Sequence, residues 1–513
     1  MKTLAAFLVA AAIAAAQTEW PTYSGDYSGQ RYSTLKQIDR TNVSRLRVKW
    51  MYQTNDLDQF EVTPIVSGGV MYISEPPSNA AALDLRTGRP LWMFRRAIPN
   101  DVRVCCGQVN RGVALLNDIV YLGTLDAHLI ALDAKTGHVL WDTAVADYKA
   151  GYSITVAPLA LRDRVIVGMS GGEYGVRGFL DAYDPKTGAR LWRFWTVPGP
   201  GEPGHETWRG DSWKTGSAAT WTTGSYDANL NLIYWGTGNP GPDYDGDVRK
   251  GDDLYSDSLL ALDATTGKLK WHFQFTPNDT HDWDSTHTPV QFDAQVGGRA
   301  RKLVAVANRN GFFYVLDRET GEFVAGKAFG KVEWASGLDA LGRPIVIPGT
   351  EPKPEGVPMY PGVHGATNYM SPSYSRDTNL FYVATREEPT AYYRATVPDY
   401  KPGDFYVAGG NRGVPGVEPS GAIKALDPKS GDVRWEFPLH SPPWAGVFST
   451  AGGLLFGGTS EGNVFALDSA TGKPLWDFQT GATVTSNPIS YEFEGKQYVA
   501  LAAGRALMVF GLE

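Results

Sequence analysis

One phrase recurs along this 513-residue chain and constrains its fold more than any other feature. Each copy is a short apolar run that ends in Asp, then a turn of the type Asp-x-x-Thr-Gly, and usually a Trp four residues after the Gly. The turns of the clear copies begin at Asp84, Asp133, Asp184, Asp263, Asp317, Asp427 and Asp468. The copy at Asp317 is degenerate and ends in Phe323-Val324, and weaker copies lie at Asp227 and Ser375.

Each copy is typical of two strands joined by a hairpin turn. The Asp and Thr side chains can bond the turn backbone, and Gly tolerates positive φ. The Trp supplies a large flat apolar surface for docking on the neighbouring unit. Repeats of about 40–50 residues with four short strands indicate propeller blades. Clear and weak copies together predict an all-β, eight-bladed β-propeller with tryptophan-docking motifs, formed as a single domain by residues 17–513.

A propeller must also close its ring. We expect an N-terminal strand near Trp50-Met51-Tyr52 to pair with the last blade, whose final strands are predicted at 498–503 and 506–511. Long Gly- and Pro-rich segments at 197–204, 240–251 and 345–365 interrupt the regular units. Loops of this length are either functional lids or surface decoration.

The N-terminus and the charge limit the location and the partners of the protein. Residues 1–16 carry one Lys and then an apolar run that closes on Ala14-Ala15-Ala16, which predicts a signal peptide. An uncleaved anchor is the alternative, although the run is short for a membrane span. No later segment is apolar for long enough to cross a bilayer, so we expect an exported, periplasmic protein. The formal net charge is −8 and no basic tract occurs, which argues against a nucleic-acid partner.

The sequence has two cysteines, and they are neighbours, Cys105 and Cys106. Ordinary disulfides join Cα atoms about 4.4–6.8 Å apart, whereas neighbours across a trans peptide are about 3.8 Å apart. A bond between them would form a small strained ring, which cannot cross-link distant parts of the fold but could offer a stiff surface to a ligand. The residues alone leave both interpretations open, a pair of buried free thiols and a vicinal disulfide.

The segment that runs from Cys105-Cys106-Gly107 to Arg111-Gly112 resembles the vicinal-disulfide motif of PQQ-dependent alcohol dehydrogenases. This family includes the quinoprotein methanol and ethanol dehydrogenases, and its tryptophan-docking repeats match the turns described above over nearly the whole chain. The resemblance implies bound pyrroloquinoline quinone (PQQ), a Cys105–Cys106 disulfide against one face of it, and a contact from Arg111 to a cofactor carboxylate.

The same resemblance implies further contacts to the cofactor. They fall on Glu61, Thr155, Ser170, Gly171, Gly172, Trp221, Arg309, Asn368 and Trp444. Trp221 is expected to stack on the face opposite the disulfide, and Arg309 to lie near the quinone oxygens. For Trp221 or Trp444 alone, blade packing would be the simpler interpretation, because the chain has 16 tryptophans.

Oxygen-bearing side chains suited to a hard cation stand in turn-rich segments at Glu173, Asn239, Asp282 and Asp284. Any single Asn or Asp beside Gly or Pro is more often a turn former. The resemblance implies that Glu173, Asn239 and Asp282 bind a metal ion and that Asp282 is the base that takes the alcohol proton. Asp284 stands where lanthanide-dependent members have Asp, so we expect a lanthanide in preference to Ca²⁺. His281 and Trp283 differ from the Trp and Tyr or Phe that flank this aspartate in methanol dehydrogenases.

These predictions describe a periplasmic enzyme that oxidises small alcohols to aldehydes. The sequence has no Cys-x-x-Cys-His, so we expect no covalent haem within it and a soluble cytochrome c as electron acceptor. A homodimer is also compatible with the sequence. One alternative is a PQQ dehydrogenase for a sugar, a polyol or a polymer alcohol. Another is a non-catalytic propeller scaffold of the outer-membrane assembly type, which would need neither Cys105-Cys106 nor the Glu173, Asn239 and Asp282 set.

Overall fold

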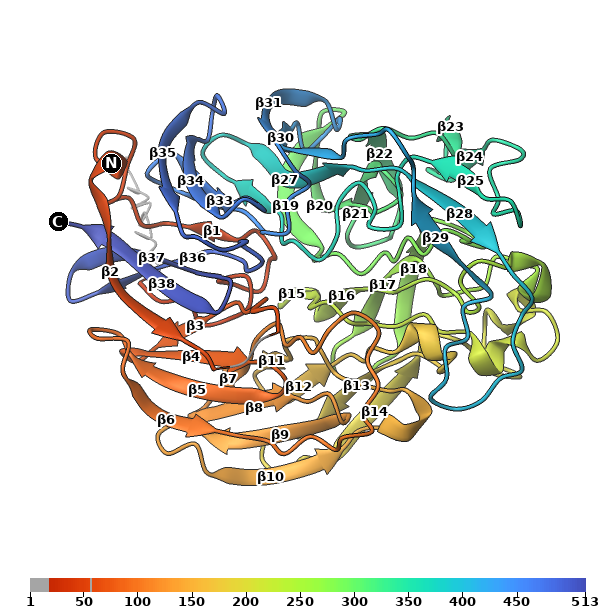
Figure 1. Cartoon of the computed structure of the whole chain (residues 1–513), viewed down its shortest axis with the longest axis horizontal. Coiled ribbons are helices and arrows are strands. Elements are labelled where there is room, and N and C mark those ends of the chain that lie inside the picture. The colour runs from red at the N-terminus through yellow and green to blue at the C-terminus, as the bar shows by residue number, and fades with distance from the viewer. Residues whose placement is uncertain (1–17, 56–57) are drawn as a thin grey trace, which may run out of the picture.

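The computed structural model describes residues 18–55 and 58–513. The predicted signal peptide, residues 1–16, lies outside the described residues. Figure 1 shows β-sheets that follow one another around a ring in chain order, so that the red N-terminal strands come to lie beside the blue C-terminal ones. In the described ranges, helix occurs only as short 3-10 turns. The prediction of an all-β propeller is therefore confirmed.

The described residues form seven four-stranded sheets and one five-stranded sheet around the ring. The first sheet contains β3 (Ile65–Ser67), β4 (Val70–Glu75), β5 (Asn79–Asp84) and β6 (Pro90–Phe94). The second contains β7 (Ala114–Leu116), β8 (Ile119–Gly123), β9 (His128–Asp133) and β10 (Val139–Ala144). The third contains β11 (Leu159–Leu161), β12 (Arg164–Val167), β13 (Phe179–Tyr183) and β14 (Arg190–Trp195). The fourth contains β15 (Ser225–Asp227), β16 (Leu232–Gly236), β17 (Ser258–Asp263) and β18 (Leu269–Gln274). The fifth contains β19 (Val290–Val296), β20 (Arg299–Ala307), β21 (Phe312–Asp317) and β22 (Phe323–Ala328). The sixth contains β26 (Ser373–Ser375), β27 (Leu380–Glu387), β30 (Ser420–Leu426) and β31 (Val433–Leu439).

The last two sheets combine strands from both ends of the chain. The five-stranded sheet contains β1 (Tyr32–Ser33), β32 (Phe448–Thr450), β33 (Leu454–Gly458), β34 (Asn463–Asp468) and β35 (Pro474–Gln479). The closing four-stranded sheet contains β2 (Leu46–Gln53), β36 (Ile489–Phe493), β37 (Lys496–Ala503) and β38 (Ala506–Leu512). Two small sheets join β23 (Ala335–Leu338) with β24 (Pro344–Val346), and β25 (Val357–Met359) with β28 (Thr390–Arg394) and β29 (Gly409–Gly413). The 3-10 turns are η1 (Val43–Arg45), η2 (Tyr148–Ala150), η3 (Gly172–Tyr174), η4 (His205–Thr207), η5 (Ser212–Thr215) and η6 (Gly246–Arg249). The described residues include no helix of the length and apolar character that crossing a membrane requires.

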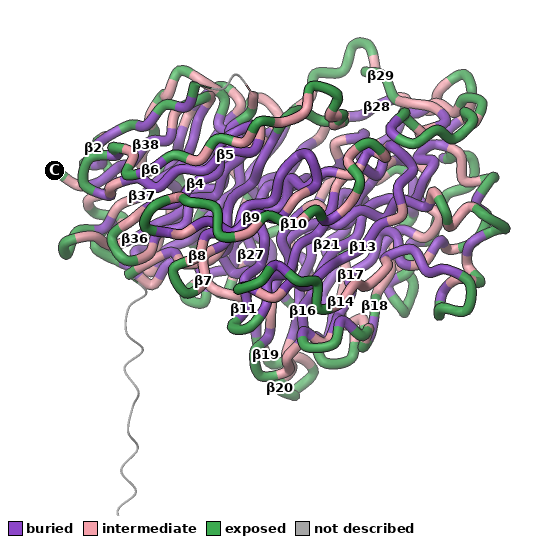
Figure 2. The backbone as a smooth tube through the Cα atoms, turned by 90° about the horizontal axis from the view of Figure 1, so that it is seen from below, coloured by how far each residue is buried: buried purple, intermediate pink, exposed green. Residues whose placement is uncertain are grey.

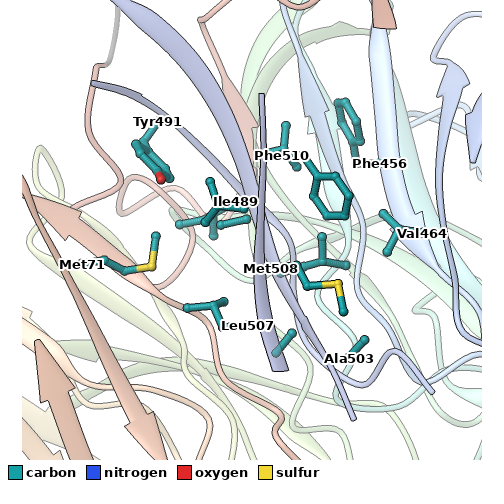
Figure 3. Close-up of a cluster of buried hydrophobic side chains, with 14 of the residues drawn as sticks. Met71, Phe456, Val464, Ile489, Tyr491, Ala503, Leu507, Met508 and Phe510 are labelled. Atoms are coloured by element: carbon teal, nitrogen blue, oxygen red, sulfur yellow. The ribbon is translucent and has the colours of Figure 1, made fainter. Parts of the chain in front are cut away.

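The ring closes as the sequence predicted. Strand β2 pairs antiparallel with β38, and Trp50 lies opposite Val509. A second link is parallel, where β1 pairs with β32. Figure 3 shows the apolar core at this seam, where Met71 of β4, Phe456 of β33 and Phe510 of β38 belong to one buried cluster. Burial of this cluster from three sheets stabilises the closure.

The repeated turns dock each sheet on the next. Asp84 accepts hydrogen bonds on Oδ1 from the Thr87 N–H (2.9 Å) and the Thr87 hydroxyl (2.8 Å). Gly137 has φ +73°, and a Cβ there would lie 2.7 Å from the Trp92 ring, so the turn of one sheet leaves room for the Trp of the previous one. The Trp92 Nε1–H donates to the Ala134 carbonyl at 2.8 Å. The same indole-to-carbonyl bonds join Trp50 to Leu85, Trp141 to Pro185, Trp192 to Ala264, Trp271 to Arg318 and Trp435 to Ser469.

Two of the weaker copies are not separate units. Asp227 ends β15, in the same sheet as the Asp263 turn, and Ser375 ends β26, in the same sheet as the Asp427 turn. Each lies in a hairpin between the first and second strands of its sheet. The sequence of such a hairpin resembles that of a docking hairpin, because in both a polar turn adjoins a short apolar strand. The copy at Asp317 lacks the docking Trp. Gly431, in the following docking turn, therefore faces Lys327 and Phe313, where the glycines of the other turns face a Trp.

The sheet geometry gathers two kinds of connection at one end of the ring. In a four-stranded antiparallel sheet, the connection that enters the first strand and the one that joins the second to the third lie at the same end. Figure 2 shows buried backbone along strands such as β13, β17 and β21, whereas an outermost strand such as β10 has no buried residue. Side chains on these two connections of successive sheets can therefore meet around one space, far apart though they are in sequence.

Candidate active site

A cavity of about 500 Å³ lies among these connections. Every residue that the sequence predicted for the cofactor, the metal ion or catalysis lies on its wall. These residues are Glu61, Cys105, Cys106, Arg111, Thr155, Ser170, Gly171, Gly172, Glu173, Trp221, Asn239, Asp282, Asp284, Arg309, Asn368 and Trp444. The structure thus brings together positions that the chain distributes over more than 380 residues (61 to 444). Their individual roles remain predictions.

Neighbouring cysteines form one wall. Cys105 and Cys106 are joined by a disulfide, as the family resemblance implied. Both are exposed, which excludes the interpretation as buried thiols. The Glu173 Oε1 lies 3.0 Å from the Cys105 Sγ. The disulfide therefore presents its sulfur surface to the cavity, next to a carboxylate.

A cationic centre lies where a carboxylate-bearing ligand would need it. Arg111 pairs with Glu61 at 2.8 Å and donates to the Thr155 hydroxyl at 2.9 Å, and that hydroxyl lies 2.7 Å from the Ser170 hydroxyl. The Arg111 guanidinium carbon lies 4.8 Å from the centre of the Trp221 ring. This wall combines a buried cation, two hydroxyl groups and a flat aromatic face.

Asn368 and Trp444 line the cavity together with Tyr369, which the sequence did not predict. Tyr369 stacks on Trp444, with ring centres 5.8 Å apart and planes 14° apart. Its ring also lies 5.0 Å from the Arg111 guanidinium carbon. The Asn368 side chain accepts from the Tyr369 N–H at 2.8 Å and donates to the His364 carbonyl at 3.0 Å. No local motif marks Tyr369, because its neighbours in the site come from other sheets.

The acidic wall is organised by Arg309. This guanidinium pairs with Asp284 at 2.6 Å, lies 3.7 Å from the Asp282 Oδ1, and donates to the Val363 carbonyl. Asp284 also accepts from the Asn239 N–H at 3.1 Å. Each side chain sits on a connection of the kind described above: Glu173 between β12 and β13, Asn239 between β16 and β17, Asp282 and Asp284 before β19, and Arg309 between β20 and β21.

Among the described residues, Glu173, Asp282 and Asp284 do not form one compact set of ligand atoms. Across the part of the chain that the structure describes, the ligand atoms of His, Cys, Asp and Glu side chains include one set of three within 4.8 Å of one another. This set consists of Cys105, Cys106 and Glu173. Disulfide sulfurs are poor ligands for a hard cation, so this set is not a metal centre by itself. Asp284 and Asp282 line the same cavity as Glu173, and both lie within 4 Å of the Arg309 guanidinium.

Burial dominates the electrostatics of the acidic wall. It raises the pKa of Glu173 to about 7, and Asp284 adds to the effect. It also raises the pKa of Asp282 well above its ordinary value, although Arg309 opposes the shift. Burial lowers the pKa of Arg309, but Asp282 and Asp284 outweigh it, and the net shift is upward. A group of buried carboxylates with one guanidinium between them has an excess of negative charge that a cation would offset.

Comparison with known proteins identifies the family. The model of the PQQ family, described as the β-propeller domain of glucose, ethanol and alcohol dehydrogenases, matches residues 20–327 and 417–499. The quinoprotein alcohol dehydrogenase PedH of Pseudomonas putida is 42% identical over 504 residues, which cover 93% of this chain and 84% of the relative. The chain belongs to the PQQ-dependent quinoprotein alcohol dehydrogenases.

Solved structures of this family have the same fold. The quinohemoprotein alcohol dehydrogenase of Comamonas testosteroni is 36% identical with a TM-score of 0.92, and the match covers 98% of this chain and 81% of that one. A europium-containing methanol dehydrogenase is 34% identical with a TM-score of 0.91, covering 97% of this chain and 98% of the other. Family membership argues against the alternative of a non-catalytic scaffold.

The residues present fit the cofactor of this dehydrogenase family. PQQ is flat and carries three carboxylates, and the cavity offers Trp221 and the disulfide as flat surfaces and Arg111 as a cation. The Nε atoms of Arg111 and Arg309 are buried without a hydrogen-bond partner among the described residues, so both guanidinium groups retain a donor that an anionic ligand could use. For the metal ion, the available donors are carboxylate and amide oxygens, the ligand types that hard cations prefer.

The long segment 345–365 belongs to the dehydrogenase cavity as well. Its residues Val363 and His364 line the wall, and the Val363 carbonyl accepts from Arg309. Of the two functions considered from the sequence, surface decoration is thus excluded for this loop. Asn411, in β29, also lines the cavity and was missed for the same reason as Tyr369.

Proposed function

We propose that this protein oxidises alcohols to aldehydes, with PQQ and a metal ion bound in the described cavity. The observation that carries the proposal is the arrangement of Asp282 and Arg309 on the wall of a cavity that also presents the Cys105–Cys106 disulfide. A base, a guanidinium and a rigid surface for a flat cofactor then face one space. PQQ, when bound, supplies the two-electron acceptor for the hydride that leaves the alcohol carbon.

The chain's own residues handle the proton and the orientation. Asp282 accepts the proton of the alcohol hydroxyl, because it is the carboxylate that is both partly exposed to the cavity and close to Arg309. Arg309 holds Asp284 by an ion pair and leaves Asp282 at a longer distance. On the other wall, Arg111, Thr155 and Ser170 would bind cofactor carboxylates, and Trp221 and the disulfide would fix its plane. Glu61, Gly171, Gly172, Asn368 and Trp444 complete the proposed cofactor site.

The proposed metal site comprises Glu173, Asn239, Asp282 and Asp284. We propose that a lanthanide is preferred over Ca²⁺, because a trivalent ion is better stabilised by three carboxylates than by two. The excess negative charge of the acidic wall supports this preference, and a europium-containing methanol dehydrogenase has the same fold.

The setting of the reaction is also a proposal. The seven four-stranded sheets and the five-stranded sheet would be the eight blades of one domain, residues 17–513, which follows a cleaved signal peptide. The enzyme would act in the periplasm, pass electrons to a soluble cytochrome c, and act as a monomer or a homodimer. A sugar, a polyol or a polymer alcohol remains the second candidate for the substrate, because His281 and Trp283 differ from the residues that flank this aspartate in methanol dehydrogenases.

The test is dye reduction by the mature chain with added PQQ and either La³⁺ or Ca²⁺, over a panel of primary alcohols, polyols and sugars. We expect activity on alcohols with La³⁺ and little with Ca²⁺. Activity with Ca²⁺ alone would retain the enzyme class and refute the role of Asp284. Absence of activity with both ions on all substrates would refute the proposed function.

A further inference from the structure

Asp282 has an unusual backbone conformation. It lies on the connection between β18 and β19 with φ +59°, a left-handed conformation that residues other than glycine rarely adopt. Such a conformation persists only where the surrounding structure holds it. The bonds that hold this backbone therefore decide where the Asp282 carboxylate points.

A neighbouring carboxylate spans Asp282. The Asp279 Oδ1 accepts from the His281 N–H at 2.9 Å, and its Oδ2 accepts from the Trp283 N–H at 2.7 Å. These are the N–H groups of the two residues that flank Asp282. Asp279 is only 2% exposed, and bonds from N–H groups to a buried carboxylate are among the stronger ones in proteins. Asp279 thus fixes both sides of the Asp282 backbone with one side chain.

The flanking rings are fixed as well. His281 and Trp283 stack, with ring centres 4.3 Å apart and planes 12° apart. The His281 Nε2 lies 2.9 Å from the Thr350 carbonyl, and the Trp283 Nε1–H donates to the Gly362 carbonyl at 3.1 Å. Both carbonyls belong to the segment 345–365.

The same segment holds the arginine of the site. The Val363 carbonyl, next to Gly362, accepts from Arg309. The Gly362 carbonyl thus anchors the Trp283 ring, and the adjacent Val363 carbonyl anchors the Arg309 guanidinium. That guanidinium lies 3.7 Å from the Asp282 carboxylate. One short stretch of backbone, Gly362 and Val363, therefore contacts both Trp283 and Arg309.

We propose that Asp279 is a positioning residue, which holds Asp282 toward the cavity by binding the N–H groups on both sides of it, while Trp283 anchors this loop to the segment 345–365. The inference rests on the proposed role of Asp282 as the base. Asp279 does not line the cavity, so it would act through Asp282 and not by contact with a ligand. This function goes beyond the cofactor, metal and base assignments of the proposed function.

The test is Asp279→Asn in the full mature chain. The amide keeps the shape of the side chain but turns one acceptor into a donor, which faces an N–H group. We expect faster amide hydrogen exchange in peptides that cover residues 279–284, and a fall in kcat of about 10- to 100-fold with little change in KM. Asp339→Asn is the matched control, because Asp339 accepts from the N–H groups two and four residues later, Leu341 and Arg343, in an exposed turn. It should leave kcat and the exchange of 279–284 unchanged.

Hydrogen exchange separates the failure of this inference from the failure of the proposed function. If the wild-type chain oxidises no alcohol but Asp279→Asn still accelerates exchange at 279–284, the clamp stands and the role of Asp282 falls. Unchanged exchange and unchanged kcat in Asp279→Asn would overturn the inference. If Asp279→Asn does not fold, Trp283→Phe decides, because it keeps a ring in the stack and removes the donor to Gly362. Exchange and kcat should then change in the same direction as expected for Asp279→Asn, and wild-type values would refute the proposal.

Discussion

The docking turns at the rim of the ring and the acidic wall of the cavity are both rich in carboxylates. The pKa values of Asp84 and Asp133 at the rim and of Glu173 and Asp282 in the cavity shift in opposite directions. At the rim, the Thr87 hydroxyl and N–H lower the pKa of Asp84, and Thr136 does the same for Asp133. In the cavity, burial raises the pKa of Glu173 to about 7 and that of Asp282 well above its ordinary value. The chemical group is the same in both places, and only its surroundings differ.

The difference shows which carboxylates the protein satisfies by itself. Asp84 and Asp133 each accept hydrogen bonds from groups of their own turn. Each copy of the turn can therefore satisfy its own carboxylate. The cavity carboxylates are buried around one guanidinium and retain unfavourable charge, which a bound cation would offset. Asp84 and Asp133 stabilise their own turns, whereas the buried carboxylates around Arg309 favour a bound cation.

The largest effect should come from a change of carboxylate to amide in each region. Asp282→Asn should lower kcat by about 10²- to 10⁴-fold, the usual contribution of a general base. The matched rim variant Asp133→Asn should retain wild-type kcat. Steady-state dye reduction with PQQ and La³⁺ measures both. Equal losses in the two variants would show that the rim and the cavity do not differ in function.

The next effect concerns the charge of the metal ion. Asp284→Asn removes one anionic ligand and should weaken lanthanide binding by about 10- to 100-fold, whereas Ca²⁺ binding should change less, because affinity for a trivalent ion depends more steeply on ligand charge. Tb³⁺ luminescence excited through tryptophan, with La³⁺ and Ca²⁺ as competitors, measures the two affinities. Asp263→Asn at the rim is the control. An equal loss for both ions would contradict the proposed lanthanide preference.

A smaller effect tests the rim. Gly137→Ala should destabilise the protein by about 1 to 2 kcal/mol more than the control, because the added Cβ would lie 2.7 Å from the Trp92 ring. Gly297→Ala is the control, since Gly297 also has positive φ (+58°) but no atom within 4 Å of its added Cβ. Urea unfolding followed by tryptophan fluorescence measures the difference, and kcat of the folded variants should match wild type. Equal midpoints for the two variants would refute the role of the Trp–Gly contact.

The smallest effect is the pH dependence of stability without metal. The pKa of Glu173 is raised from 4.5 to about 7 in the folded chain, so the folded chain binds more protons than the unfolded chain between these values. Its contribution to stability therefore falls as pH rises from about 5 to 8. We expect a lower Tm at pH 8 than at pH 5 by calorimetry, a smaller difference in Glu173→Gln, and a larger gain in Tm from La³⁺ at pH 8. A gain from La³⁺ that is larger at pH 5 would contradict this account.

Local signals predicted most of the fold. The Asp-x-x-Thr-Gly turns encode their own hydrogen bonds, so they identified the hairpins between β5 and β6 and between β9 and β10 from the sequence. The weaker copies do not mark further sheets, because Asp227 and Ser375 stand in hairpins of sheets that already have a docking turn. The sheet of β2, β36, β37 and β38 has no such turn, and only its apolar strands and the need for closure predicted it.

The site was predicted by resemblance, and its supports were not. Tyr369 contacts Trp444 and Arg111, and Asp279 binds the backbone beside Asp282, but the sequence assigned a role to neither, although each stands close to a predicted site residue. Contacts across sheets depend on the finished ring, which local patterns do not encode. The function of the segment 345–365 as a support for Arg309 and Trp283 could not be read from its Gly and Pro content.

The pairing of β2 with β38 has a consequence for the order of events during biosynthesis. β2 is synthesised early, whereas its partner β38 is synthesised after all the other strands. Until then, the edge of β2 that pairs with β38 has no hydrogen-bonding partner strand. An unpaired apolar strand edge favours association with other chains. Until the last strand arrives, the nascent molecule is an open arc whose two free edges match each other, and two such arcs could pair with one another before either closes. The seam is thus the point at which folding competes with aggregation.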